Sequence, residues 1–492
     1  MLSRLYRLEY KYLVAIVFIF GLTMDMVDST AVNVAIPTLS KDFHASTQAV
    51  EWTVTGYLLS LAIFIPSSGF LSDRFGTKKT FMLAMAVFTF FSALCGLSQT
   101  LWQLVLFRFL QGMGGGMMTP VSTAILSRAF PGEERAKASA IISVPVVFAP
   151  VFGPVLAGYL VEYTTWRWIF YINLPIGIIG LFLSWKILRE HKEAYAQGRF
   201  DFLGLVLGGA SAALILYALA EAADYGFTAP RVVSSGIGGL AILTAFCLWE
   251  LHADPPLLDL RLFKSSLFTL GNMGVVASFC AFSGFLFLLV LYLQELQGHD
   301  PLHAGLIQAP SAFGTVISLP AASRLYTRVG PRRLMLIGFG LGVLVLLPFA
   351  FVGQNTSAPV IILLLTLRGL PFGFGMVASQ TIIYGPLPSD KQGAASSIYN
   401  TMRQMFASFG VALAATILVS RTNAYIHAGK SPGTASVLAY HEAFLMTAAI
   451  LLLSCLAGAF VSDKKARESM RRRVAARTAE GEAATQEALA LH

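Results

Sequence analysis

The fold is decided by residues 13–37, which read LVAIVFIFGLTMDMVDSTAVNVAIP. A helix rises about 1.5 Å per residue, so this apolar stretch is long enough to cross a bilayer. Two carboxylates interrupt the stretch, Asp25 and Asp28, and their spacing places both on one face of the helix. An ionised carboxylate at membrane depth is strongly unfavourable unless it is paired, hydrated or protonated. The pair therefore either lies near the membrane surface and stays solvated, or forms a proton-binding site within the membrane.

The composition indicates a membrane protein. Of 492 residues, 56% are hydrophobic and 12% are charged, and soluble domains carry about twice that charge. The net charge is +9, but most of the 35 Lys and Arg residues lie in alternate loops and in the two tails. This distribution follows the positive-inside rule, so the basic balance indicates topology and not a nucleic-acid partner.

The cysteines and the loops show no pattern typical of a metal site or an enzyme. No metal-ligand spacing, nucleophile–base cluster or phosphate-binding loop stands out, so we expect neither a metal nor enzymatic activity. All four cysteines lie inside apolar segments, where we expect inert thiols: Cys95, Cys247, Cys280 and Cys455.

Apolar runs separated by charged or Pro/Gly-containing loops predict an all-α polytopic membrane protein with fourteen spans. An even number of spans with basic residues in both tails predicts that both termini lie in the cytoplasm. The predicted spans are approximately 13–37, 52–71, 80–98, 102–126, 138–162, 168–188, 201–222, 232–251, 268–294, 304–322, 334–352, 359–385, 393–419 and 441–461.

A weak internal repeat divides these spans into two sets. The matching segments are 74–79 with 328–333, and Arg108 and Gly115 with Arg368 and Gly375. Each copy has the same position relative to its flanking spans, which predicts two six-helix bundles, as in many secondary transporters. The predicted units are a tail at 1–12, a bundle at 13–190, an inserted two-helix hairpin at 201–251, a second bundle at 268–461 and a tail at 462–492.

The loop after the second span reads GFLSDRFGTKK at residues 69–79. It resembles the signature G-x-L-A-D-R-x-G-R-K of the major facilitator superfamily. Glycines allow close helix approach, and an acid beside basic residues can form a breakable contact. The resemblance implies the major facilitator fold, with a conformational latch formed by Gly69, Asp73, Arg74, Gly76, Lys78 and Lys79. In the second half Thr327 fills the position of Asp73, so that loop lacks the acid.

Further motifs resemble the fourteen-span drug:proton antiporter branch of this superfamily, the EmrB/QacA type. Residues 108–115 read RFLQGMGG, similar to the motif R-x-x-Q-G-x-G. Residues 28–37, DSTAVNVAIP, and 166–177, WRWIFYINLPIG, resemble the first span of that branch and the run before its sixth span. Residues 149–158 read APVFGPVLAG, similar to the antiporter motif G-x-x-x-G-P-x-x-G-G, although the same small residues also suit generic tight packing. Alanines replace two of its glycines, and the matched positions are Pro150, Gly153, Pro154 and Gly158.

The resemblance implies a proton-coupling site. Asp28 lies in the branch-specific motif and is the expected proton carrier. Asp25 lies outside that motif, and we expect either a second titrating group or a counter-charge for cationic substrates. Arg108, inside an apolar span, needs an acceptor or water and is expected to favour deprotonation when it approaches. Polar residues expected either to line a central cavity or to form helix–helix hydrogen bonds are Asn33, Tyr57, Gln111, Gln380, Asn400, Arg403 and Gln404.

The resemblance also implies a function, namely proton-coupled export of hydrophobic or amphipathic compounds, including drugs. Export of an endogenous metabolite, lipid or siderophore by the same mechanism is an alternative, and so is a membrane receptor that binds ligand without transport. We expect a monomer in the bacterial inner membrane, in contact with lipid, driven by the proton gradient without a cofactor. A periplasmic adaptor protein is left open.

Overall fold

The computed structural model describes residues 10–130, 153–190, 200–254, 256–387 and 391–464, together with 466 and 468. Within these ranges the regular structure is helical and contains no strand, which confirms the all-α prediction. Pro150 lies outside the described residues, and the side chains of Asp73 and Thr327 are not described. The helices are α2 (Tyr10–Asp42), α3 (Thr47–Phe64), α4 (Ser67–Phe75), α5 (Thr77–Leu97), α6 (Leu101–Ala129), a helix over 153–163, α8 (Trp168–Tyr171), α9 (Asn173–Ile187), α10 (Phe202–Tyr225), α11 (Pro230–His252), η2 (Leu260–Lys264), α12 (Ser266–Leu291), η3 (Tyr292–Leu296), α13 (Pro301–Gln308), α14 (Pro310–Val329), α15 (Pro331–Leu346), η4 (Leu347–Phe351), α16 (Ala358–Tyr384), α17 (Gln392–His427) and α18 (Pro432–Ala459).

Ten helical segments in the described part of the chain are long and apolar enough to cross a membrane. They match ten of the predicted spans, namely the first, the third, the sixth to the ninth and the eleventh to the fourteenth. At three of the other positions the structure has α3, α6 and α14, and the fifth span falls partly outside the described residues. The chain is therefore a multi-pass membrane protein, whereas a total of fourteen spans stays a prediction.

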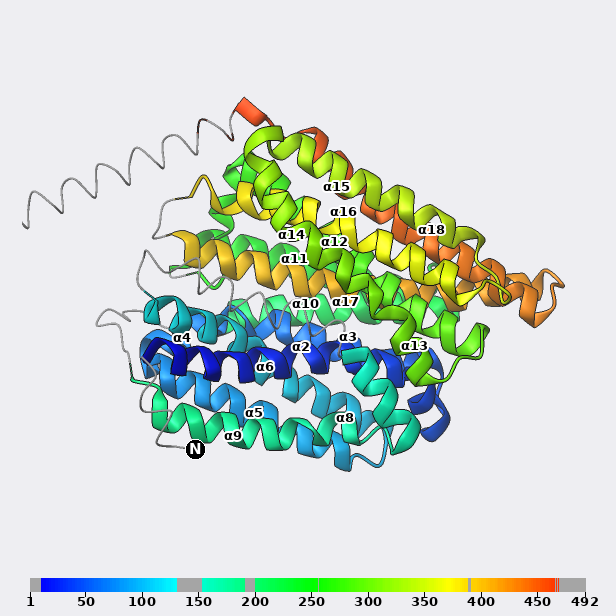
Figure 1. Cartoon of the computed structure of the whole chain (residues 1–492), viewed down its shortest axis with the longest axis horizontal. Helices are drawn as coiled ribbons and strands as arrows, with labels where there is room; N and C mark the ends of the chain where they lie inside the picture. The colour runs from blue at the N-terminus through cyan, green and yellow to red at the C-terminus, as the bar shows by residue number, and fades with distance from the viewer. Residues whose placement is uncertain are drawn as a thin grey trace, which may run out of the picture.

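The helices pack in two groups, which lie one below the other in Figure 1. In the first group, which we call the N-half (α2 to α9), α6 and α9 each contact both α2 and α5. In the second, the C-half (α12 to α18), α12 contacts α17 and α18, and α16 contacts α14 and α15. The halves meet mainly where α3 packs against α17, and α2 adds contacts with α12 and α13.

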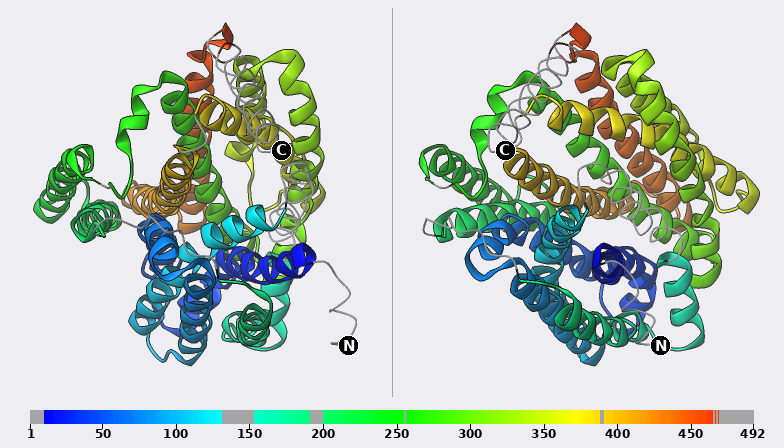
Figure 2. Two further views of the ribbon diagram at one scale, coloured as in Figure 1. Left: turned by 90° about the vertical axis from the view of Figure 1, so that its left-hand side faces the viewer. Right: turned by 60° about the vertical axis from the view of Figure 1, so that its left-hand side comes forward.

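Helices α10 and α11 form a hairpin that lies at one side of the molecule, beside both halves (Figure 2). Its α10 contacts α3 of the N-half and α17 of the C-half. The Gln48 amide of α3 donates to the backbone oxygen of Ala220, and the Thr416 hydroxyl of α17 donates to that of Leu219 at 2.8 Å. Each half is thus hydrogen-bonded to the same turn of α10.

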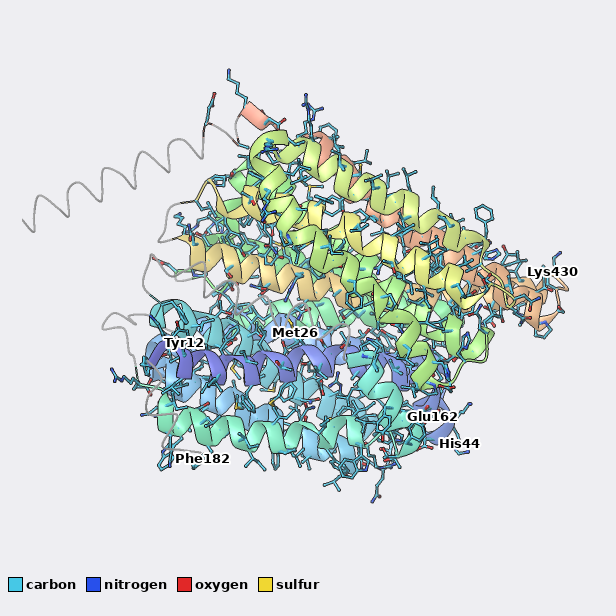
Figure 3. All side chains as sticks on the ribbon, viewed as in Figure 1. Tyr12, Met26, His44, Glu162, Phe182 and Lys430 are labelled. Atoms are coloured by element: carbon cyan, nitrogen blue, oxygen red, sulfur yellow. The ribbon has the colours of Figure 1, made fainter. Side chains whose placement is uncertain are left out.

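Helix α2 carries the two aspartates through the middle of the N-half. It begins at Tyr10 and continues through Pro37 to Asp42, so it is longer at both ends than the predicted span. Proline lacks a backbone N–H, but membrane helices tolerate it where neighbouring groups satisfy the freed carbonyl. Figure 3 shows Met26, which lies between the aspartates, near the middle of the bundle, with Tyr12 and His44 at opposite ends.

Candidate functional site

Asp28 lies at the centre of a buried network, with 1% of its surface exposed. It forms an ion pair with Arg108 of α6. It also accepts hydrogen bonds from the side-chain amides of Gln111, at 3.2 Å, and Asn173, at 2.9 Å. A buried carboxylate is tolerated when a counter-charge and further donors satisfy it. The geometry therefore suits Asp28 as an anion.

Arg108 is completely buried, and other side chains and backbone groups fix its orientation. Its Nε donates to the backbone oxygen of Thr53 at 3.1 Å, and a terminal nitrogen donates to Gln111 Oε1 at 2.7 Å. The guanidinium lies 4.0 Å from the centroid of the Tyr57 ring, close enough for a cation–π contact. Helices α3 and α6 thus hold the cation beside α2.

Asp25 lies one turn away from Asp28 in a different environment. The Tyr57 hydroxyl donates to its Oδ1 at 2.6 Å, and the Thr119 hydroxyl donates to its Oδ2 at 3.0 Å. No lysine or arginine of the described residues forms an ion pair with it. Asp25 is 7% exposed. A carboxylate at this depth without a cation is available to a proton or to a cationic ligand.

The predicted polar residues of the N-half divide into two kinds. Tyr57 and Gln111 join the aspartate network. The Asn33 amide instead donates to a backbone oxygen of its own helix, that of Ser29, at 3.4 Å. Asn33 therefore contributes no hydrogen bond to the aspartates.

The predicted polar residues of the C-half lie on α16 and α17. The Gln380 amide donates to the Tyr399 hydroxyl at 2.7 Å. Asn400 donates to backbone within its own helix at 2.9 Å. Arg403 and Gln404 are half-buried, and the Arg403 Nε is buried without a hydrogen-bond partner.

Three residues of the network were not predicted, namely Ser92, Thr119 and Asn173. The Ser92 hydroxyl accepts hydrogen bonds from the amides of Gln111, at 2.5 Å, and Asn173, at 3.2 Å. Asn173 lies in the quoted run at 166–177, and an amide at the start of an apolar span is the signal that could have identified it. A serine or threonine in a helix gives no such signal, since its hydroxyl often bonds to its own backbone.

The predicted latch lies at the junction of α4 and α5. Gly76 has a φ of 100°, a conformation that favours glycine. The backbone N–H of Lys78 donates to Glu190 Oε1 at 3.1 Å, and its ammonium donates to the backbone oxygen of Trp185 at 2.7 Å. Glu190, which was not predicted, therefore caps the start of α5. The other described members of the latch are exposed, namely Gly69, Arg74 and Lys79.

The antiporter-motif helix, over 153–163, packs between the halves. Gly153 faces α2, and a Cβ atom on Gly158 would lie 2.4 Å from the backbone oxygen of Pro301 in α13. A Cβ atom on Gly305 of α13 would lie 2.5 Å from the backbone oxygen of Pro154. Small residues permit this close approach of two helix backbones. The motif therefore forms a direct contact between the N-half and the C-half.

Two hydrogen bonds join the halves at the same end of the molecule. The Gln294 amide donates to the backbone oxygen of Val34 at 2.9 Å, and the Thr47 hydroxyl donates to Glu295 Oε1 at 3.3 Å. We call these bonds, together with the packing of the motif helix on α13, the interhalf contacts. They hold the halves together at the end of the molecule where α2 ends and α3 begins.

Long apolar helices in two groups, with a buried charged network among them, are typical of membrane transporters. The profile of the Major Facilitator Superfamily matches residues 18–411, and the chain belongs to this family. The superfamily predicted from the loop at 69–79 is thereby confirmed, while the fourteen-span branch stays a prediction.

One relative is named as an MFS-type transporter, and a solved transporter shares the fold. The chain is 33% identical over 408 residues to an uncharacterized MFS-type transporter, YhcA, of Bacillus subtilis, covering 83% of this chain and 76% of that protein. It is 33% identical over 411 residues to a multidrug resistance protein B homolog of Mycobacterium tuberculosis, with the same coverage of 83% and 76%. A bacterial homolog of the human lysosomal transporter Spinster, solved in an inward-facing and occupied conformation, shares the fold. Its TM-score is 0.65 at 15% identity, covering 94% of this chain and 98% of that one.

Proposed function

We propose that this protein is a proton-coupled exporter of hydrophobic or amphipathic compounds. One observation carries the proposal, namely that one helix holds two buried carboxylates in different electrostatic environments. Asp28 is paired with Arg108, whereas Asp25 has hydroxyl donors and no cation among the described residues. Relatives named multidrug resistance proteins support drug-like compounds as the exported class.

Asp28 is assigned the role of proton carrier. In this conformation the Arg108 guanidinium occupies the position that a proton would take on the carboxylate. Protonation of Asp28 removes the charge that holds Arg108, and a buried guanidinium without a counter-charge must move or find another acceptor. Because Asp28 lies on α2 and Arg108 on α6, proton binding is linked to the positions of two helices. The proton gradient then supplies the driving force without a further cofactor.

We assign Asp25 the role of binding either a proton or a cationic substrate, so that one is exchanged for the other. A protonated carboxyl has lost the charge that attracts a cation, so proton and substrate compete for Asp25. Such competition couples the exit of one to the entry of the other. The two aspartates thereby act as one coupled site.

The interhalf contacts suit a closed outer end. We assign this end to the periplasmic face of a bacterial inner membrane, with both termini in the cytoplasm. Release of substrate to the outside then requires the antiporter-motif helix to separate from α13. The transporter acts as a monomer in lipid, and an adaptor protein would extend the route across an outer membrane.

Exchange in proteoliposomes tests this function. Purified full-length protein is reconstituted with a pH-sensitive dye inside, and a cationic rhodamine ester is supplied under an imposed proton gradient. With the wild type, we expect the rhodamine ester to cause a proton flux that the pH-sensitive dye reports. This flux should fall about tenfold or more in Asp25→Asn and Asp28→Asn. Asp42→Asn, the same substitution at the end of the same helix, is the control and is expected to retain exchange.

Two outcomes would contradict the proposal. Wild-type exchange in both Asp25→Asn and Asp28→Asn would show that neither carboxylate couples transport to protons. Saturable binding of the rhodamine ester without counterflow or proton flux would identify a receptor instead of a transporter. Size-exclusion profiles of the variants separate lost exchange from lost folding.

A further inference from the structure

Arg403 lies on α17 of the C-half without an acidic partner. Its guanidinium is 5.3 Å from the centroid of the Phe279 ring, and its Nε is buried and unbonded. No carboxylate of the described residues forms an ion pair with it. A partly buried guanidinium with an unused donor favours an anionic acceptor, since unpaired buried polar groups are unfavourable and charge-assisted hydrogen bonds are strong.

Aromatic and polar side chains accompany Arg403 on this wall of the C-half. Tyr399 lies one turn earlier on α17 and accepts a hydrogen bond from Gln380 at 2.7 Å. The ring centroids of Tyr384 and Tyr399 are 5.8 Å apart. A cation beside hydroxyl groups and ring faces suits an amphipathic ligand that carries an acidic group.

The opposite charge lies across the boundary between the halves. Helix α17 packs against α3, where the Ser408 hydroxyl donates to the backbone oxygen of Thr55 at 3.1 Å, and Tyr57 of α3 donates to Asp25. Arg403 and Asp25 thus belong to helices on the two sides of α3, and they do not form an ion pair. In the described part of the chain, each of them lacks a partner of opposite charge. The two halves thus present one uncompensated anion and one uncompensated cation to the same region.

This arrangement discriminates among ligands by charge. A purely cationic ligand pairs with Asp25 but is repelled by Arg403, which stays unpaired. A purely anionic ligand pairs with Arg403 but is repelled by Asp25. A ligand that carries both charges satisfies both side chains, and specificity of this kind arises as much from repulsion of the wrong ligand as from attraction of the right one.

We propose that the preferred substrates are zwitterionic amphiphiles, with the cationic group at Asp25 and the anionic group at Arg403. The proposal rests on the export function proposed above and adds the substrate class. Because the two side chains come from different halves, such a ligand bridges the halves when it binds.

Two matched dyes test the proposal, namely a rhodamine methyl ester, which is a cation, and its free acid, which is a zwitterion. Binding to the purified full-length protein in detergent is measured by fluorescence polarisation. We expect the wild type to bind the free acid about tenfold more tightly than the ester, since the two differ by one charge-assisted contact. Arg403→Gln is expected to lose this preference, because it weakens binding of the free acid and relieves the repulsion of the ester, and Arg403→Lys is expected to keep part of it.

The control is Arg421→Gln, the same substitution near the end of the same helix. Arg421 pairs with Glu442 outside this cluster, so its loss should leave the preference for the free acid unchanged. Equal affinity of the wild type for the two dyes would overturn the proposal. An equal loss of both dyes in Arg403→Gln would also overturn it, because a structural role affects both alike.

The wild-type comparison decides the matter even where a variant fails to fold. Binding is measured without a gradient, so the proposal and the export function can fail separately. Preference for the free acid in a protein that exchanges no dye for protons would support the zwitterion site and contradict export. Exchange of the ester by a protein without that preference would support export and contradict the zwitterion site.

Discussion

Arg108 and Arg368 occupy matching positions in the two halves, yet their surroundings are opposite. Arg108 is paired with Asp28. Arg368 lies over the rings of Phe282 and Phe285, at 4.8 and 4.1 Å, and no carboxylate of the described residues pairs with it. The repeat thus preserves the place of a buried cation but not its acid. We therefore assign the proposed proton chemistry to the N-half.

The two halves differ in their central charged groups, but they are alike in how a helix start is capped at one end. In each half a glycine with positive φ precedes a helix, Gly76 with 100° and Gly330 with 84°. Two residues further on, a backbone N–H donates to a carboxylate that follows the last helix of that half. The acceptors are Glu190, at 3.1 Å, and Asp463, at 3.0 Å. Helix capping is shared by the halves, whereas the charged site is not.

The largest effect on stability is expected from removing the charge of Asp28. Asp28→Asn leaves Arg108 buried without a counter-charge, which lowers the free energy of unfolding by about 3–5 kcal/mol. The double variant Asp28→Asn/Arg108→Gln removes both charges and is expected to recover most of that loss. Thermal unfolding of the purified proteins in detergent measures both effects. A single variant as stable as the wild type would show that the ion pair does not hold Arg108.

A methyl group at the matching glycines is expected to affect the halves in different ways. A Cβ atom on Gly375 would lie 2.4 Å from the Phe339 ring, so Gly375→Ala should cost about 1–3 kcal/mol of stability through overpacking. A Cβ atom on Gly115 would lie 2.9 Å from Asp25 Oδ1 and 3.0 Å from the Tyr57 hydroxyl. Gly115→Ala should therefore disturb that hydrogen bond and slow dye exchange by about tenfold. Melting temperature and exchange rate are measured on the same preparations. Slower exchange in Gly375→Ala together with lower stability in Gly115→Ala would contradict the comparison.

A smaller effect on stability is expected from Arg368→Gln. The substitution loses cation–π contacts worth about 0.5–2 kcal/mol, but it also removes a buried charge that has no counter-ion. We expect the two to offset, leaving the free energy of unfolding within about 1 kcal/mol of wild type. Arg108→Gln, the matched substitution in the N-half, leaves Asp28 buried without a counter-charge and should be clearly more destabilising. Equal losses in parallel melts would show that the two arginines are held in the same way.

The sequence predicted the class of fold and part of the site. Apolar runs predicted the helices, because burial in lipid demands long apolar segments whatever the packing. The motifs singled out Asp28 and Arg108, which the structure joins in an ion pair. The group that each polar side chain bonds to depends on how its helix is rotated. A sequence motif does not specify that rotation. Asn173 reaches Asp28, whereas Asn33 and Asn400 bond to their own helices.

The smallest effects on stability are expected at the ends of the halves, where the comparison predicts equal losses in the N-half and the C-half. Glu190 and Asp463 each accept from the start of a helix, where unpaired N–H groups and the helix dipole favour a negative charge. Glu190→Gln and Asp463→Asn keep an acceptor but lose the charge, so each should reduce stability by about 0.3–1 kcal/mol at low salt. Because salt screens such contacts, both losses should shrink in parallel when melts are repeated at high ionic strength. A loss several times larger for Glu190→Gln than for Asp463→Asn would mean that the contact with Lys78 does more than complete a helix end. The N-half would then differ from the C-half at its surface as well as at its centre.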